Sequence, residues 1–548
     1  MRKHLFIFLL SSVLLSALQA QEAVKSIEED YYNFLSLLGY APRPYLNYRT
    51  FSDSAWIVDD ETEHPWKPYL SAYIPLSDNF RMRVYGPELF MSGNTAAPYG
   101  QNDGLLWQGR GLNLMLKGGV RFEGYGFEIT LLPHFVFSQN VPFDIMTSAY
   151  ESEFGYIWGY RHGIGADAPQ RFGDQPFFDF DFGDSEIRYT WKALTVGFGT
   201  QTIWLGPSYI NSILHSNNAP AYPKFDIGLR RQQIIIPGTD VYIGDIETRL
   251  WIGHLSESDY FDSDPDNDYR MIHGFSFAYA PSFLPGLTLF ANTIVTAPWD
   301  LESLRYIIPS DENTVEDRKG AFGFSWIFPE VGFEVYGELG IDDGMPFGPA
   351  GYIRHPFHTT VYTAGFKKVF PISEDNKIYG QILFEFNWME MTKDFFFFWP
   401  YTFYFHHIII QGYTNRGQWL GNGLGSGGNS QYIGFSIYYP KGTSTIFFQR
   451  NNPDNDFLYR NAIYDSVNNP MLAASNRHHF KANFNIGVLT SHFLTNNFLF
   501  SYNVIYNMII NPLYELTLEP HLIDGEAYFG KLQFLHNISF NLAIKYIF

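Results

Sequence analysis

The chain has 548 residues, no cysteine, a formal net charge of −20 and 19% aromatic residues. Without cysteine it can form no disulfide, cysteine-ligated metal site, thiol nucleophile or lipid-modified cysteine, and its charge is unfavourable for a nucleic-acid partner. The mean hydropathy of −0.15 excludes a bundle of apolar membrane helices. The aromatic content instead suits the interface girdles of a membrane β-barrel.

Residues 1–20 have the pattern of a signal peptide. Arg2 and Lys3 form a basic start, residues 5–15 are apolar, and Ser16 to Ala20 offer a small-residue cleavage site. The apolar stretch is too short to span a membrane as a helix. We therefore expect the chain to be exported and to lose about 20 residues.

Residues 21–45 are expected to form a short periplasmic helical segment. Between Glu22 and Tyr40 the apolar residues recur at helical spacing, and Gly39 is a suitable stop. A tether packed on the rim of the barrel is the simpler interpretation of this helix, ahead of a direct functional role.

From residue 46 to 548 the sequence reads as β-hairpins of an antiparallel transmembrane barrel. Residues 112–116 and 127–131 alternate apolar and polar side chains, as do 187–191 and 194–198. About 25 to 30 residues for each strand with its loop predicts 16 to 20 strands, and we expect 18, because single-chain bacterial barrels favour even numbers. No second globular domain is indicated.

The last strand is the most informative part of the chain. From Ile538 to Phe548 every second residue is apolar, and the residues between them are mostly polar or small. This pattern suits a strand with one face in lipid and the other in a polar lumen. An aromatic residue at the end of such a strand resembles bacterial outer-membrane barrels. We therefore expect contact with outer-membrane lipid, lipopolysaccharide and the barrel-assembly machinery.

Three constellations could carry chemistry, and none is persuasive. The acidic run Asp262 to Asp268 has Asn267 where a calcium loop needs glycine, so an exposed turn is the better interpretation. The histidine pairs, 406–407 and 478–479, would point to opposite faces if they lay on strands. No Gly-x-Ser-x-Gly elbow or P-loop is present. We expect no enzyme activity, metal or cofactor.

Two largely uncharged segments remain, at residues 204–223 and 412–423. Irregular backbone at membrane depth is tolerated only inside protein or water. Serine and asparagine offer donors and acceptors that match sugar hydroxyls, and tryptophan offers a stacking face. A structural plug is an equally good interpretation of the first segment.

The same two segments carry a family resemblance. The first reads Trp-x-Gly-Pro, then Ser-x-x-x-Ser-Asn-Asn-Ala-x-x-x-Pro, and the second reads Gly-Tyr-x-x-Arg-Gly-x-x-x-Gly. In sequence and order they resemble signatures of the Wzi family of capsule-assembly proteins. That resemblance implies an 18-stranded outer-membrane lectin, preceded by a periplasmic helical element, that helps to anchor surface polysaccharide.

From this resemblance we expect non-catalytic binding of surface or capsular polysaccharide, with the first segment folded inside the barrel. Aromatic residues would stack on sugar rings, and the polar residues would bind hydroxyls or carboxylates. The candidate polysaccharide-binding residues are Trp204, Ser212, Asn217, Asn218, Tyr413, Arg416 and Trp419. The alternative is a porin-like diffusion channel or transporter for a small solute, which would share the barrel, the signal peptide and the final strand.

Overall fold

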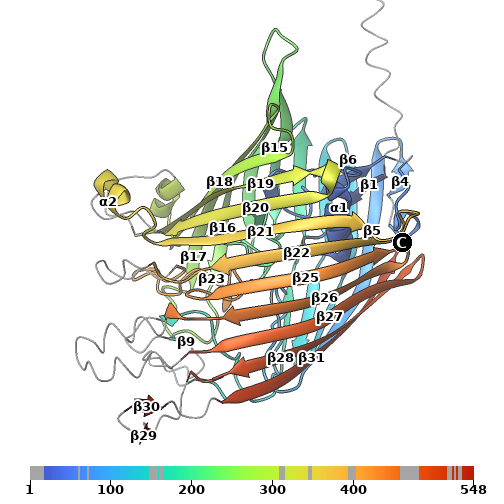
Figure 1. Cartoon of the computed structure of the whole chain (residues 1–548). Helices are drawn as coiled ribbons and strands as arrows, with labels where there is room; N and C mark the ends of the chain where they lie inside the picture. Colours follow the sequence, from blue (N-terminus) through green and yellow to red (C-terminus); the bar gives the residue numbers. More distant parts are fainter. Residues whose placement is uncertain are drawn as a thin grey trace, which may run out of the picture.

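The computed structural model describes residues 18–59, 62–70, 73–146, 158–159, 165–307, 315–342, 348–392, 403–456, 480–514, 521–523, 526–528 and 533–548. Its main feature is a closed antiparallel barrel (Figure 1). The strands of the barrel sheet are β4 (Ile74–Ser77), β5 (Phe80–Asn94), β6 (Gly111–Gly124), β7 (Phe127–Leu131), β8 (His134–Ser138), β11 (Phe177–Asp181), β12 (Glu186–Trp191), β13 (Leu194–Gly199), β15 (Lys224–Ile235), β16 (Tyr242–Ser256), β17 (Tyr269–Pro281), β18 (Leu287–Pro298), β19 (Asp317–Phe328), β20 (Phe333–Asp342), β21 (Thr360–Pro371), β22 (Tyr379–Trp388), β25 (Asn429–Tyr439), β26 (Gly442–Asn452), β27 (Ala482–Thr495), β28 (Phe498–Ile510) and β31 (Phe534–Ile547).

The wall has 18 strands, as predicted. β7 and β8 both pair with β6 and form one interrupted wall strand, and β11 and β12 form the next, because they pair with β8 and β7 respectively. The barrel closes where β31 pairs with β5, while the short β4 only extends the rim. Both hairpins expected near residues 112–131 and 187–198 are present with those turns.

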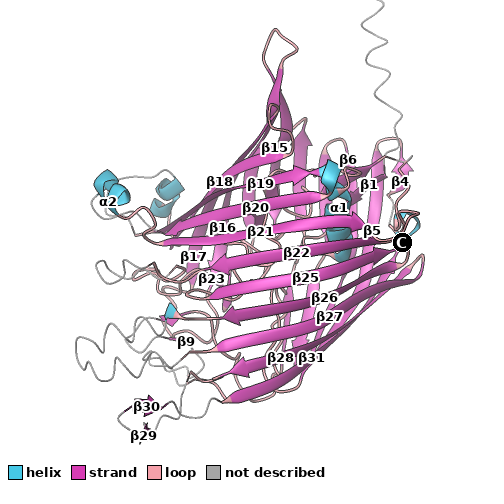
Figure 2. Cartoon of the chain, viewed as in Figure 1, coloured by secondary structure: helices cyan, strands magenta, loops and turns pink. Residues whose placement is uncertain are grey.

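Smaller elements lie in the connections between the wall strands (Figure 2). They are β1 (Leu18–Gln21), α1 (Ile27–Leu37), β2 (Tyr48–Arg49), β3 (Ala55–Val58), η1 (Lys67–Tyr69), β9 (Trp158–Gly159), β10 (Gly165–Ala166), β14 (Trp204–Leu205), η2 (Glu302–Ile307), η3 (Pro329–Val331), α2 (Gly348–Arg354), β23 (Thr414–Asn415), β24 (Gln418–Trp419), β29 (His521–Ile523) and β30 (Glu526–Tyr528). Some of them lie inside the barrel, such as α1, and some beyond its end, such as α2 (Figure 2). No helix in the described part of the chain is long and apolar enough to cross a membrane.

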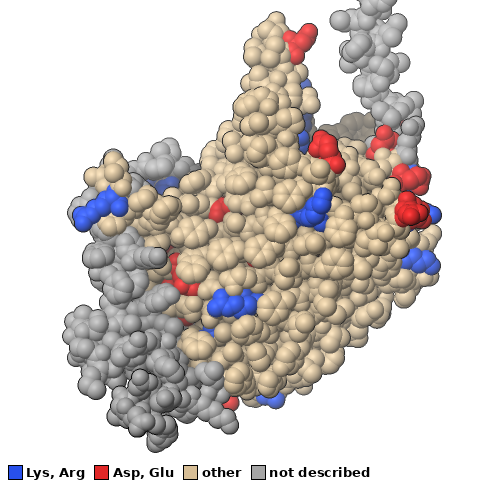
Figure 3. Space-filling view, in the orientation of Figure 1, with Lys and Arg blue, Asp and Glu red and all other residues tan. Residues whose placement is uncertain are grey.

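Alternation along the strands separates an apolar outer surface from a polar lumen. On β31, Phe540 and Leu542 are exposed whereas Asn537 and Ser539 are fully buried. The face of the barrel in Figure 3 is correspondingly mostly uncharged, with a few scattered charged side chains. An uncharged belt around a polar interior is the pattern of a barrel that spans a lipid bilayer.

The lengths of the connections orient the barrel. Turns at one end are short, such as residues 192–193, 440–441 and 496–497, whereas those at the other end are long, such as 200–223 and 389–428. Barrels of this class have short periplasmic turns and long external loops. The long connections, at the left of Figure 1, therefore mark the external end.

The N-terminal segment occupies the periplasmic part of the lumen. Helix α1 begins where Ser26 accepts a hydrogen bond from the backbone N–H of Glu29, and it is followed by Gly39 with φ of 75°. Its buried Phe34 stacks on Tyr438 of the wall at 4.2 Å. The expected short helix is thus confirmed, although it is shorter than the Glu22–Tyr40 span. It lies inside the barrel and not on the rim, where we expected it.

Ion pairs join this segment to the wall. Arg43 donates two hydrogen bonds to Glu334 of β20, at 2.7 and 2.8 Å, and Asp53 accepts from Arg249 of β16 at 3.0 Å. In a low-dielectric lumen such pairs are strong only because each charge has a partner. The N-terminal segment is therefore fixed by specific charges as well as by packing.

The proposed signal peptide falls mostly outside the described residues. Its last residues, Leu18 to Ala20, pair with β3 as part of β1. Cleavage after Ala20 would leave only Gln21 of that strand, and the division of the chain at residues 20 and 45 stays a prediction.

Candidate functional site

The two uncharged segments singled out in the sequence pack against each other inside the barrel. The backbone N–H of Ser216 donates to Leu420 O at 2.9 Å, and the amide of Asn218 donates to Trp419 O at 3.0 Å. The Tyr413 hydroxyl donates to Leu214 O at 2.7 Å. Residues about 200 positions apart in the chain thus form one folded unit, which we call the loop plug (residues 203–223 and 403–426).

Two glycines in or beside these segments occupy positions where a side chain would not fit. Gly206 has φ of 82°, and a Cβ there would lie 2.9 Å from a carboxylate oxygen of Glu338. A Cβ on Gly421 would lie 2.1 Å from the Tyr404 hydroxyl and 2.3 Å from Ile213 O. Both positions need glycine because the backbone turns or because another segment approaches closely.

The loop plug is attached to the wall and to the N-terminal segment. The Glu385 carboxylate of β22 accepts the backbone N–H groups of Tyr209 and Asn211, at 2.5 and 2.8 Å. Strand β14 pairs with β2, so that Trp204 lies opposite Arg49. External and periplasmic segments therefore meet within the lumen.

Three of the seven candidate residues are at most 1% exposed within this packing. Trp204 is 0% exposed, with the Arg49 guanidinium 5.0 Å from its ring centroid. Ser212 donates to Leu205 O at 2.6 Å, and Tyr413 is 1% exposed. In this conformation none of the three presents a free face to a ligand, and their sugar contacts stay untested predictions.

The other four candidates lie nearer to solvent. Asn218 and Trp419 line a cavity at the external side of the loop plug. Asn217 is partly buried, and its side-chain oxygen accepts no hydrogen bond among the described residues. Arg416 is partly exposed and pairs with Asp179.

The cavity has a volume of about 1130 Å³. This is slightly more than the roughly 300–1,000 Å³ of typical small-molecule sites. One side is formed by the inner faces of β26, β27, β28 and β31, and the other by the connection 96–110 and the loop plug.

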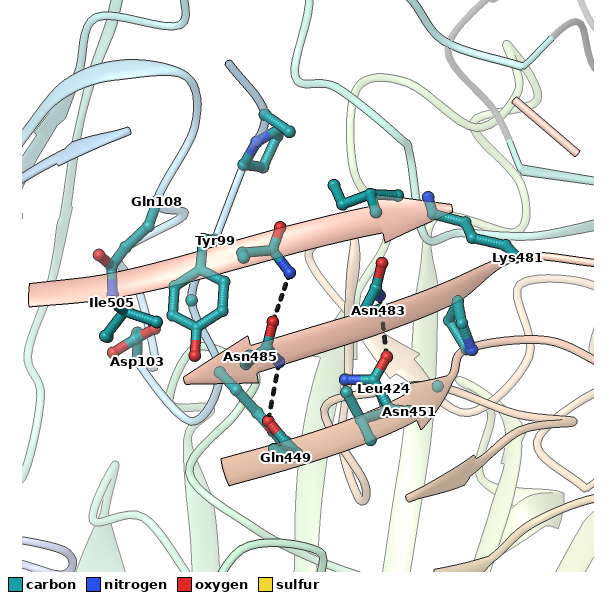
Figure 4. A pocket seen from close by; sticks show the side chains of 18 of the residues that line it. Tyr99, Asp103, Gln108, Leu424, Gln449, Asn451, Lys481, Asn483, Asn485 and Ile505 are labelled. Carbon is teal, nitrogen blue, oxygen red and sulfur yellow. Dashed lines mark hydrogen bonds between the residues drawn. The ribbon is translucent and has the colours of Figure 1, made fainter. Parts of the chain in front are cut away.

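The strand side of the cavity carries a network of side-chain amides, which we call the amide ladder (Gln449, Asn451, Asn483, Asn485 and Asn507). Asn507 donates to Asn485, Asn485 donates to Gln449 at 3.1 Å, and Asn483 donates to Asn451 at 2.8 Å (Figure 4). Each amide keeps donor or acceptor capacity beyond these bonds. The ladder therefore holds several polar groups in fixed positions at the cavity surface.

The opposite side adds aromatic rings and unpaired acceptors. Tyr99, Trp107 and Trp419 line the cavity. The side-chain oxygens of Asn102 and Gln108, which also line it, are buried and accept no hydrogen bond in the described part of the chain. Buried polar atoms normally have partners, so these are positions where a hydroxyl group would be stabilised.

One carboxyl group of the cavity has a strongly altered acidity. Asp103 accepts a hydrogen bond from the Gln108 amide at 2.8 Å. Burial nevertheless raises the pKa of Asp103 to about 7, because the charged form loses solvation. Near neutral pH this carboxyl is therefore only partly ionised.

The sequence analysis did not identify the amide ladder, although a signal was present. Asn483 and Asn485 alternate with the apolar Phe484, Ile486 and Val488. Such a period-two pattern places the amides in the lumen. What the sequence could not give is which strands are neighbours across the barrel and which parts of the lumen are left open.

The residue groups considered as possible metal sites form no such site in the described part of the chain. Asp262 to Asp268 form a largely exposed turn with local bonds, such as Asp264 N–H to Asp262 at 2.8 Å. His406 and His407 lie in a loop with their ring centroids 4.6 Å apart, so the assumption that they face opposite sides of a strand was wrong. The pair 478–479 falls outside the described residues. Where the structure is described, no three metal-ligating side chains of this kind come together.

Comparisons with known proteins agree with this architecture. The family model described as capsule assembly protein Wzi matches residues 150–290, which include the first signature segment. A search of curated proteins gave no match. Among solved structures, the Escherichia coli outer-membrane protein Wzi is 13% identical with a TM-score of 0.59, over 96% of this chain and 100% of that one. Its description is a carbohydrate-binding β-barrel involved in group 1 capsule assembly.

Other solved barrels are less similar. Pseudomonas aeruginosa OccD3 is 10% identical with a TM-score of 0.39, over 87% of this chain and 94% of that one. Pseudomonas putida OprB is 10% identical with a TM-score of 0.35, over 85% and 94%. The chain therefore contains a match to the Wzi family model at residues 150–290, which include the first signature, and its barrel fold is similar to that of Escherichia coli Wzi.

Proposed function

We propose that this protein binds surface polysaccharide without catalysis and so keeps the polymer on the cell. The observation that carries the proposal is the external cavity, which combines a wall of fixed amides with aromatic rings. Amides match the paired donors and acceptors of sugar hydroxyls, and aromatic faces stack on the apolar side of sugar rings. The described activity of Escherichia coli Wzi supports the same assignment.

Retention would come from many weak contacts. A single sugar at the ladder would gain only about 1 kcal/mol for each net hydrogen bond. A polymer presents the same unit many times, and a polymer that contacts several barrels is held by avidity. Rapid exchange at each site is compatible with firm retention of the chain.

The segments that cross the lumen argue against the porin-like alternative. The loop plug and the N-terminal segment meet at the β2–β14 pair, and both are hydrogen-bonded to the wall. A small-solute channel needs a continuous water-filled path. We therefore expect negligible ion conductance from the intact protein in a planar bilayer.

Further partners are proposed from the outer surface. The apolar belt fits outer-membrane lipid and the lipid part of lipopolysaccharide. The alternating residues of β31 and the exposed Phe548 that follows it fit recognition by the barrel-assembly machinery. Deletion of Phe548 should reduce the amount of folded barrel in the membrane, and unchanged amounts would contradict this role.

The test of the proposed function is a comparison between a deletion strain and its parent. The measured quantity is the fraction of surface polysaccharide that stays with the cells after centrifugation. We expect the total amount to be unchanged and the cell-bound fraction to fall. Unchanged retention would contradict the proposal and would make bilayer conductance the next measurement.

A further inference from the structure

The charged groups of the external cavity differ in whether they have partners. Six charged side chains line it: Lys25, Asp103, Arg110, Asp144, Asp454 and Lys481. Lys25 is near Asp30, at 3.9 Å, and Arg110 donates to the carbonyl oxygens of Thr95 and Pro142 at 3.2 and 2.6 Å. Lys481 has no ion pair with any described residue.

Lys481 lies directly before β27, two residues from Asn483 of the amide ladder. Residues two apart along an extended chain point to the same side, and Figure 4 shows both side chains at one end of the ladder. Its only described side-chain interaction is a distant one, because the ammonium nitrogen lies 5.6 Å from the ring centroid of Tyr514. A cation therefore lines the cavity with hydrogen-bonding capacity to spare.

The environment of this lysine is unfavourable in the absence of a counter-ion. The Lys481 side chain is partly buried. Burial lowers the pKa of Lys481 to about 8, and no charge among the described residues offsets this effect. A buried charge is tolerated at low cost only when it is paired. An anionic group in the cavity would supply that partner.

Resting on the proposed function, we infer that the cavity selects acidic sugars and that the Lys481 ammonium pairs with a sugar carboxylate. The amide ladder would bind hydroxyls of the same or the adjacent sugar. A carboxylate fits this position better than a phosphate, because a phosphate is a dianion and Lys481 is a single cation beside neutral amides. The cavity also contains three aspartates, which reduce its positive charge further.

The experiment uses the purified full-length barrel and the polysaccharide released from its own host. The polymer is offered in its native form and after chemical reduction of its carboxyl groups to alcohols. Affinities are measured for the wild type and for Lys481→Met, Lys481→Arg and Lys377→Met. Lys377 is an exposed lysine at the opposite end of the barrel and serves as the matched control. Thermal melting shows whether each variant is folded.

We expect native polymer to bind about ten- to hundredfold more tightly than reduced polymer, because one hydrogen bond to a charged group contributes about this much affinity. Lys481→Met should abolish this preference, whereas Lys481→Arg and Lys377→Met should keep it. Binding of the native polymer should also weaken from about pH 7 to about pH 9, as Lys481 loses its proton.

Equal binding of the two polymers, or an unchanged preference in folded Lys481→Met, would overturn the inference and leave polysaccharide binding intact. Binding of neither form would contradict the proposed function itself. If Lys481→Met does not fold, the comparison of native with reduced polymer on the wild type still tests the selection of acidic sugars. The loss of affinity between about pH 7 and about pH 9 then tests the role of Lys481.

Discussion

The two parts of the lumen are polar in different ways. The periplasmic part is crossed by ion pairs, with Asp226 between Arg188 and Arg249 at 2.5 and 2.6 Å. The external part beside β26 to β31 has neutral amides and remains open. Paired charges hold protein segments in one place, whereas neutral amides leave hydrogen-bonding capacity for a ligand. The difference separates a region built for occlusion from one suited to binding.

Asp53→Asn should have the largest effect, because it removes a charge that joins the N-terminal segment to the wall. Asp53 accepts hydrogen bonds from Arg230 and Arg249, both at 3.0 Å. Loss of one partner of a buried pair costs about 3 kcal/mol or more. We expect a lower melting temperature and bursts of ion conductance in planar bilayers. Asp240→Asn, at an exposed turn, is the control; equal behaviour of the two variants would contradict a locking role for this network.

Trp419→Ala should weaken polysaccharide binding without opening the lumen. The ring lines the cavity and also stacks on Tyr404 at 5.7 Å. Loss of a stacking face is worth about 1 kcal/mol, so we expect several-fold weaker binding and no conductance. Trp191→Ala, on the exposed outer surface of the wall, is the matched control. Conductance from Trp419→Ala would show that occlusion and binding are not separate.

Asn485→Leu tests the amide ladder directly. This residue donates to Gln449 and accepts from Asn507. Replacing it leaves both neighbours with one fewer partner and removes a contact for sugar hydroxyls, at about 1 kcal/mol for each bond. Binding measured by calorimetry should fall by roughly fivefold. Asn79→Leu, at a periplasmic turn, should bind normally, and a similar loss there would refute a specific role for the ladder.

Asp103 provides a smaller, pH-dependent test of the cavity. Because its folded-state pKa is raised to about 7, the folded form binds more protons than the unfolded form between about pH 4 and pH 7. The stability of connection 96–110 should therefore fall as the pH rises through this window. Amide hydrogen exchange of residues 96–110 would report this change. Asp103→Asn should remove the pH dependence, and a dependence that persists in this variant must have another source.

Much of the fold follows from the sequence because strand alternation is a local signal. The final strand and the 187–198 hairpin were predicted within a few residues, and the number of strands follows from chain length and parity. The position of α1 was not predictable in the same way. Its apolar face shows that it packs, but only the wall residues it meets, such as Tyr438 and Tyr379, decide that it enters the lumen.

The candidate binding residues stay a prediction, although the signatures did identify two segments that meet in the lumen. Asn218 and Trp419 from these segments line the cavity. Trp204 was predicted to stack on a sugar ring, but its ring is buried. The residues beside it, Arg49 and Lys25, lie some 150 or more positions away in the chain. Burial of that kind depends on long-range packing, which a single sequence does not specify.

The most direct test of the account is to fill the cavity and measure polysaccharide binding. Because the chain has no cysteine, Asn503→Cys provides one labelling site on the cavity wall, and Asp240→Cys provides one at a remote exposed turn. Each variant is treated with a bulky maleimide and compared with its unlabelled form. The account predicts that labelling at position 503 abolishes binding while labelling at position 240 does not. Undiminished binding by the fully labelled, folded 503 variant would contradict the claim that this cavity holds the polymer.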